Sequence, residues 1–176
     1  YFKSGATEKV VFDAFYRKNP CNGAYAIACG LEQVIEYIKN LHFEEKDIEY
    51  LRSTGFFMDD FLDYLRDFRF TGDIYAVPEG TIVFPREPLV KVVAPIMEAQ
   101  LVETALLNII NHQCLIATKT ARVVHEAGPG VMEFGLRRAA LLVHVEDLVN
   151  DIFGIEMLDL QAFDDEFRIF AEKFER

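Results

Sequence analysis

The longest helical pattern in the chain is EAQLVETALLNIINHQCLIATKTA, residues 98–121. Its apolar residues recur at intervals typical of an α-helix, and the pattern continues to Ala127. These residues include Leu101, Ala105, Ile109, Ile116 and Val123. Pro95 suits the first helical position, where a backbone amide would have no partner within the helix. We therefore expect helical structure up to Ala127, although not as one straight rod.

Residues 69–95, directly before this segment, have the composition of a sheet. β-Branched and aromatic residues alternate there with two turn signals, Pro78-Glu79-Gly80 and Pro85-Arg86-Glu87-Pro88. Three antiparallel strands are expected in this region. Lys9–Arg17 is a further strand candidate, because it is rich in β-branched and aromatic residues and ends before the turn-like Asn19-Pro20.

Three helices are expected between these strand regions. The first begins near Asn22, because apolar residues recur from there at three- and four-residue intervals. They are Ala24, Ile27, Ala28, Leu31, Val34, Ile35 and Ile38. Two shorter helices follow at 44–52 and 59–67, and Asp59 or Asp60 is expected to cap the second of them.

A second region follows Gly128-Pro129-Gly130, which ends the long helical pattern. Residues 131–135 have the composition of a strand, and the helical pattern after them closes at Gly154. A terminal amphipathic helix then carries Phe163, Phe167, Phe170 and Phe174. We place the main boundary after residue 130, which divides the chain into 1–130 and 131–176. The fold class is mixed, α/β (α+β).

Composition excludes several classes of protein. With 51% hydrophobic residues the chain is not disordered, and its formal charge of −11 opposes general binding to nucleic acid. Any anionic ligand therefore needs a local basic site. The three cysteines form no CxxC pair, which favours reduced thiols in the cytoplasm over a disulfide framework. We expect no membrane span and no targeting segment.

Two adjacent arginines are the strongest candidates for an anion-binding site. Arg137 and Arg138 follow the strand-like run VMEFG and would present two forks of donors at the carboxyl edge of a sheet. Glu133 lies beside them and could orient either guanidinium. Glu103 interrupts an apolar helix face and could pair with an arginine. The alternatives are solvated surface arginines, an outward-facing strand residue and a helix-surface glutamate.

Other catalytic and metal-binding patterns are absent from the sequence. GxGxxG, GxxxxGK[ST], GxSxG and HExxH do not occur, which argues against nucleotide-loop, serine-hydrolase and zinc-protease chemistry. The histidines do not pair with Cys or carboxylate residues at metal-ligand spacing, so no metal site is expected.

The chain resembles nicotinate phosphoribosyltransferases from about Tyr1 to Ala139. Six segments occur in the order found in that family, namely FDAFYR at 12–17, GLE at 30–32, FLDYL at 61–65, PEGT at 78–81, residues 98–121 and EFGLRRA at 133–139. The resemblance implies an open-faced α/β sandwich domain beside an irregular α/β barrel, with active sites at a dimer interface. Residues 1–130 would form the sandwich domain with its long helical connection, and 131–176 an incomplete part of the barrel.

The resemblance also implies an enzyme of NAD biosynthesis by pyridine nucleotide salvage, in the glycosyltransferase or ligase class. Its substrates would be nicotinate and phosphoribosyl pyrophosphate, with coupled ATP hydrolysis and with Mg²⁺ as cofactor. By the family's motif, Arg137 and Arg138 would bind the nicotinate carboxylate or the phosphoribosyl group, with Glu133 beside them. Glu103 and Arg17 are candidate supporting residues. A cytoplasmic homodimer is expected.

The sequence departs from the family after Ala139. The Gly- and Ser-rich phosphate loop and the Gly-Thr-x-Ala-His segment with the phosphorylated histidine are not found there. His144 does not lie in that motif, so no catalytic residue is assigned. Two interpretations follow: an incomplete portion of a longer enzyme, or a catalytically inactive truncated relative that acts as a binding or dimerisation module. A relative that uses quinolinate or nicotinamide is a third.

Overall fold

The computed structural model describes residues 1–128, apart from the side chain of Cys21. The chain divides into two units, Tyr1–Arg122 and Val123–Arg176, and the description below concerns the first. The predictions for residues 129–176, including Glu133, Arg137 and Arg138, lie outside the described residues. A boundary after residue 130 stays a prediction.

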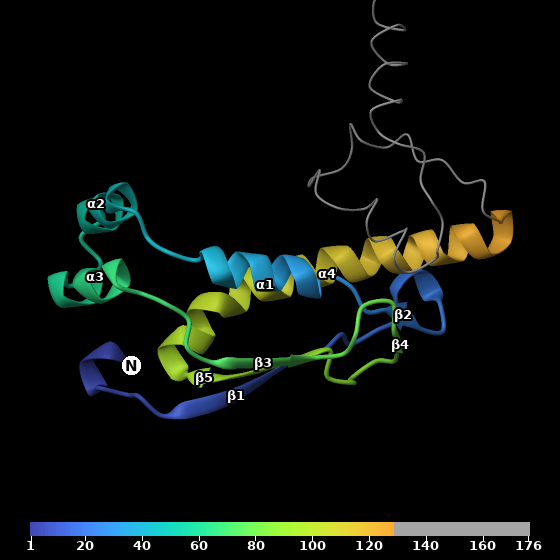
Figure 1. Ribbon diagram of the computed structural model, residues 1–176, viewed down its shortest axis with the longest axis horizontal. Coiled ribbons are helices and arrows are strands. Elements are labelled where there is room, and N and C mark those ends of the chain that lie inside the picture. Colours follow the sequence, from blue (N-terminus) through green and yellow to red (C-terminus); the bar gives the residue numbers. More distant parts are fainter. Residues whose placement is uncertain (129–176) are drawn as a thin grey trace, which may run out of the picture. The chain divides into compact units, whose positions relative to one another are not determined.

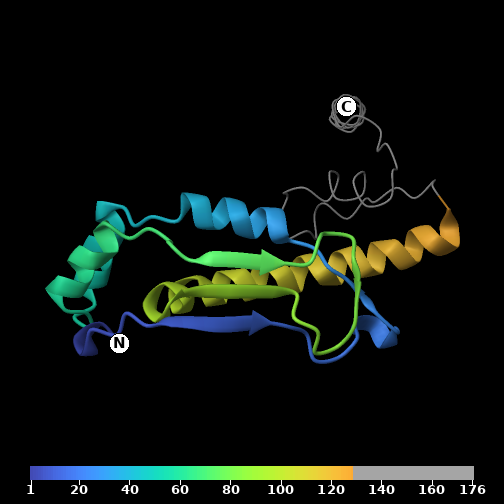
Figure 2. The ribbon, with the colours of Figure 1, turned by 60° about the horizontal axis from the view of Figure 1, so that its bottom comes forward.

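The first unit contains a three-stranded antiparallel sheet (Figures 1 and 2). Its strands are β1 (Lys9–Ala14), β3 (Asp73–Ala76) and β5 (Val90–Pro95), in the order β1-β5-β3. Side chains alternate between the two faces of the sheet, so Val90, Val92 and Ala94 of β5 are buried. The central strand therefore supplies the floor of the core.

A separate two-stranded sheet is formed by β2 (Ala26–Ile27) and β4 (Ile82–Val83). The three strands predicted in residues 69–95 are present, but β4 does not join the other two. Its backbone neighbours extend the pairing with the β2 segment instead, because Ala28 N donates to Thr81 O and Gly80 N donates to Ala28 O. The two proline-containing turns on either side of β4 separate it from β3 and β5.

Four α-helices and two short 3-10 turns complete the described part of the chain. They are η1 (Phe2–Ser4), η2 (Pro20–Asn22), α1 (Leu31–Asn40), α2 (Glu45–Ser53), α3 (Asp59–Arg66) and α4 (Ile96–Ala127). In both views α1 and α4 lie on one side of the three-stranded sheet (Figures 1 and 2). On the other side Val11 and Tyr75 are exposed. This is the predicted open-faced sandwich.

Two predictions about the helices before β3 are wrong. The first helix begins at Leu31 and not near Asn22, because residues 26–30 are buried and Ala26 and Ile27 pair with β4 as extended backbone. Asp59 and Asp60 do not cap α3, whose N-cap is Met58 without a side-chain hydrogen bond. Asp59 lies in the first turn and accepts a hydrogen bond from Arg52 Nε at 3.1 Å.

α4 is one continuous helix of 32 residues, which confirms the helical structure predicted up to Ala127. Two of its buried polar side chains have partners elsewhere in the fold: Gln113 Nε2 donates to Gln33 Oε1 at 2.7 Å, and Thr118 Oγ1 accepts a hydrogen bond from Ile27 N at 2.9 Å. These two contacts join the buried face of α4 to α1 and to β2. No helix within residues 1–128 combines the length and apolar character needed to cross a membrane.

A buried carboxylate joins the start of α4 to the entry of β3. Glu98 is 8% exposed, and it accepts hydrogen bonds from Thr71 N at 2.6 Å and from Thr71 Oγ1 at 2.9 Å. Hydrogen bonds to an ionised acceptor are stronger than neutral ones, so this contact fixes the distance between helix and sheet.

Replacing Glu98 with glutamine is expected to lower the free energy of unfolding by about 1.5–3 kcal/mol, the range for loss of charge-assisted hydrogen bonds. Urea-induced unfolding followed by circular dichroism measures this. Glu103→Gln is the matched control on the same helix, because Glu103 is exposed, and it should change stability by less than about 0.5 kcal/mol. Equal effects of the two substitutions would contradict the role given to Glu98.

Candidate functional site

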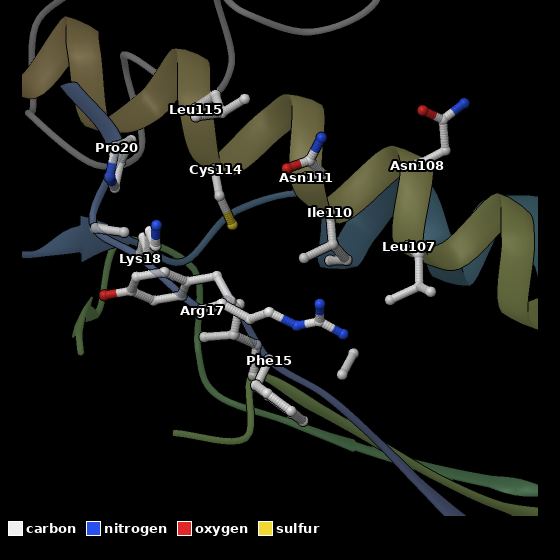
Figure 3. Close-up of a pocket in the computed structure, with 14 residues that line it drawn as sticks. Phe15, Arg17, Lys18, Pro20, Leu107, Asn108, Ile110, Asn111, Cys114 and Leu115 are labelled. Atoms are coloured by element: carbon white, nitrogen blue, oxygen red, sulfur yellow. The ribbon is translucent and has the colours of Figure 1, made fainter. Parts of the chain in front are cut away.

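A pocket of about 580 Å³ lies where the chain leaves β1 and passes α4 (Figure 3). It is lined from β1 and the following loop by Ala14, Phe15, Tyr16, Arg17, Lys18 and Pro20, and from α4 by Leu107, Asn108, Ile110, Asn111, Cys114 and Leu115, with Ala26 and Leu89 completing the wall. Most of these side chains are apolar. Two cations interrupt them at the loop.

Arg17 and Lys18 are those cations, and both are exposed. Neither makes a hydrogen bond or ion pair with another residue of the described part of the chain. The Arg17 side chain extends into the pocket below Leu107 and Ile110 (Figure 3). In a chain with a formal charge of −11, two adjacent cations without acidic partners within residues 1–128 make this loop locally positive.

Tyr16 fixes the backbone beside these cations. Its hydroxyl donates to Val83 O at 2.7 Å and lies 3.0 Å from Asn19 Oδ1, while Arg86 N donates to Tyr16 O at 2.9 Å. Burial raises the pKa of the Tyr16 hydroxyl, so it remains a neutral donor at neutral pH. The residue before Arg17 is therefore held by β4 and by the turn after it.

Cys114 lines the pocket and contacts Cys29 behind it, and both are free, buried thiols. Cys29 N donates to Cys114 Sγ, and Cys114 Sγ donates to Cys29 O, each at 3.4 Å. Desolvation by burial is the main cause that raises the pKa of both thiols, and the Glu79 carboxylate adds to it. Neither thiol is a nucleophile at neutral pH.

These raised pKa values predict a loss of stability in alkaline solution. Above the thiol's ordinary pKa of about 8.5, the unfolded chain releases protons that the folded chain retains, so the free energy of unfolding falls as pH rises. Replacing Cys29 with alanine is expected to flatten this slope between about pH 8.5 and 10.5. Unfolding in urea at a series of pH values measures it, and an unchanged slope would contradict the assignment.

The structure places two of the five predicted site residues. Arg17 lines the pocket, whereas Glu103 is exposed on α4 and does not line it; the supporting role of each stays a prediction. The buried carboxylate of this helix is Glu98, which contacts Thr71 and not an arginine. Sequence reasoning missed Lys18, although it lies directly beside Arg17 in a loop between two strands.

The described residues do not form a metal site. Within residues 1–128 no group of three or more His, Cys, Asp or Glu side chains is arranged to hold a metal ion. The Mg²⁺ implied by the family resemblance therefore has no ligand set in this part of the chain, and no chemical step is derived through it.

The fold and the pocket define an open-faced α/β sandwich domain with a cationic site at the end of its first strand. Residues 1–111 match the sequence profile described as the nicotinate phosphoribosyltransferase (NAPRTase) N-terminal domain. The chain belongs to the nicotinate phosphoribosyltransferase family, which confirms the resemblance drawn from the sequence.

Nicotinate phosphoribosyltransferases of several organisms are similar to this chain. The chain is 49% identical over 140 residues to a nicotinate phosphoribosyltransferase of Mycobacterium tuberculosis, and 48% identical over 141 residues to that of Bacillus subtilis. These alignments cover 79% of this chain but only 30% and 29% of the two relatives. The chain therefore spans less than a third of their length.

A solved structure shares the fold. The crystal structure of human nicotinic acid phosphoribosyltransferase superimposes with a TM-score of 0.72 at 33% sequence identity. The match covers 81% of this chain and 30% of the human one, and it confirms the mixed helix-and-sheet fold class.

Proposed function

We propose that this chain forms the N-terminal part of an enzyme that makes nicotinate mononucleotide and pyrophosphate from nicotinate and phosphoribosyl pyrophosphate, with ATP hydrolysis, in NAD salvage. Family membership carries the proposal, since the relatives named above are nicotinate phosphoribosyltransferases. A Mg²⁺ requirement, a homodimer and a cytoplasmic location belong to the same proposal.

The pocket supports this function chemically. Both substrates are anions, and phosphoribosyl pyrophosphate carries several negative charges that must be held while the pyrophosphate departs. Arg17 offers a planar fork of donors that suits phosphate oxygens, and Lys18 adds a second positive charge.

We assign Arg17 and Lys18 to one wall of the phosphoribosyl pyrophosphate site. Arg137 and Arg138, with Glu133 beside them, are proposed as the residues that bind the nicotinate carboxylate or the phosphoribosyl group. In this proposal, residues 14–20 form the wall that holds the phosphates, and residues around position 137 form a second anion-binding group.

The experiment that tests the function uses the full-length protein that contains this sequence. It is incubated with nicotinate, phosphoribosyl pyrophosphate, ATP and Mg²⁺, and nicotinate mononucleotide is separated by chromatography. Reactions with nicotinamide or quinolinate in place of nicotinate identify the pyridine substrate, and omission of ATP tests the coupling. Absence of product from all three pyridines at high enzyme concentration would overturn the proposal.

The second candidate function is a catalytically inactive module for binding or dimerisation. The assay of the full-length protein separates the two proposals. Product formation excludes the inactive module, whereas a stable dimer in analytical ultracentrifugation that forms no product supports it.

A further inference from the structure

Three side chains on one face of α4 bond to the backbone of residues 20–29. Cys114, Thr118 and Arg122 follow each other at four-residue intervals, which places them on one side of a helix. Cys114 Sγ meets the backbone of Cys29, as described above. Thr118 Oγ1 accepts a hydrogen bond from Ile27 N at 2.9 Å. We name these three residues the α4 ladder.

The spacing of the ladder residues along α4 nearly equals the spacing of alternate residues along the β2 segment. Four residues of an α-helix rise by about 6 Å, and two residues of a strand span about 6.6 Å. The ladder can therefore contact every second residue of the β2 segment, at positions 29, 27 and 25. The even-numbered positions face the other way, where Ala28 exchanges hydrogen bonds with Thr81 and Gly80 of the β4 segment. α4 thus occupies the edge of β2 that β4 leaves free.

Arg122 closes the ladder at the end nearest the pocket loop. Its Nη2 donates to Tyr25 O at 3.1 Å and its Nη1 donates to Pro20 O at 3.2 Å. The guanidinium also lies 5.7 Å from the centre of the Tyr25 ring. A Cβ atom at Gly23 would lie 1.6 Å from Arg122 Nη2, so a side chain at this position would displace the guanidinium.

The loop that carries the two cations is consequently held on both sides. Tyr16 anchors it before Arg17, through Val83 O and the neighbouring Asn19. Arg122 anchors it after Lys18, through the carbonyl of Pro20. The free cations occupy the short span between two fixed points, which limits the positions that their side chains can reach.

We propose that Arg122 is a positioning residue that holds Arg17 and Lys18 in place for a phosphate-bearing substrate, a role that rests on the proposed function of the pocket. It acts through the backbone of residues 20–25 and does not itself touch the substrate. Lysine at this position would keep the charge but could not bridge two carbonyl oxygens from one planar group.

The test compares Arg122→Gln, Arg17→Gln and the double variant in the full-length enzyme. Loss of Arg122 is expected to raise the KM for phosphoribosyl pyrophosphate by roughly tenfold with kcat changed by less than about threefold. The double variant should raise KM by less than the product of the two single effects, because Arg122 acts partly through Arg17 and partly through Lys18. Arg122→Lys should restore part of the loss. Arg52→Gln, which removes an arginine from a surface ion pair with Asp59, is the matched control and should change neither constant.

Additive effects of the two substitutions on KM, or an unchanged KM in Arg122→Gln, would overturn the inference. Hydrogen exchange gives a readout that does not depend on activity, because Arg122→Gln should speed exchange of the amides at 18–25 while those of β5 stay protected. If the wild-type enzyme forms no product, the proposed function fails. In that case hydrogen exchange of the amides at 18–25 is the only test of the inference. Faster exchange in Arg122→Gln supports the role of Arg122 as an anchor, and unchanged exchange refutes it.

Discussion

Alanine in place of Gly72 is expected to lower the free energy of unfolding by about 3 kcal/mol, the largest stability effect that we predict for a single methyl group. A Cβ atom at this position would lie 2.4 Å from the Cβ of Ala94, 2.7 Å from the carbonyl oxygen of Val93 and 2.8 Å from the ring of Phe70. Two of these atoms belong to the central strand, which cannot move without disturbing both of its neighbours. Relief therefore requires displacement of β3 from β5.

Gly55→Ala is the matched control for this substitution. Gly55 has a φ of +70°, and an added Cβ there would meet no atom within 4 Å. Only the backbone penalty applies, which is about 1 kcal/mol for a non-glycine residue in the left-handed region. Urea unfolding of both variants gives the difference. A Gly72→Ala variant no less stable than Gly55→Ala would show that the sheet yields to the methyl group.

Glutamine in place of Arg17 is expected to raise the KM for phosphoribosyl pyrophosphate by about 10- to 100-fold, the range for loss of hydrogen bonds to a charged partner. The effect should fall on KM more than on kcat, since the proposed contact holds the substrate's phosphates in the ground state as well as in the transition state. Because Arg17 has no partner within residues 1–128, its removal should leave stability within about 0.5 kcal/mol of the wild type.

Steady-state kinetics with varied phosphoribosyl pyrophosphate and saturating nicotinate measure this prediction. Arg86→Gln is the control, because Arg86 is also an exposed arginine of a neighbouring loop but does not line the pocket. An Arg17→Gln enzyme with the wild-type KM would remove residues 14–20 from the substrate site. The pocket would then be a structural cavity.

Much of the fold could be predicted because local patterns and tertiary structure agree. The helices predicted at 44–52 and 59–67 are α2 and α3, whose apolar faces bury Ile48, Leu62 and Leu65 against each other and against Leu101 of α4. Aromatic rings extend this cluster. The centre of the Phe61 ring lies 5.4 Å from that of Phe2 and 5.9 Å from that of Phe57. Helices with one buried face give the clearest signal in a sequence.

The start of α1 could not be predicted because its determinants are distant in the chain. Apolar residues at 26–29 fit a helix as well as a buried strand, since the segment is covered on two sides. The helix begins after Gly30, whose φ of 100° is left-handed. Glu79 accepts hydrogen bonds from Gly30 N at 2.8 Å and Glu32 N at 3.3 Å, which supplies the cap from another turn.

The candidate site was only partly accessible to sequence reasoning for the same reason. Arg17 could be singled out from the family motif, but the carboxylate that matters for α4 is Glu98 and not Glu103. Both interrupt apolar runs, and only the position of Thr71, 27 residues away, distinguishes them. The α4 ladder is likewise invisible in local patterns, because each of its contacts joins residues more than 80 positions apart.

The strand order β1-β5-β3 determines when the three-stranded sheet can form during synthesis of the chain. β5 is the last of these strands to leave the ribosome, yet both β1 and β3 pair only with it in their sheet. When only the first 89 residues have left the ribosome, β2 can pair with β4, but β1 and β3 have no partner in their own sheet. A translational pause at this stage would prolong the exposure of their edges and favour aggregation, whereas a pause once residue 122 has left the ribosome would allow the first unit to close.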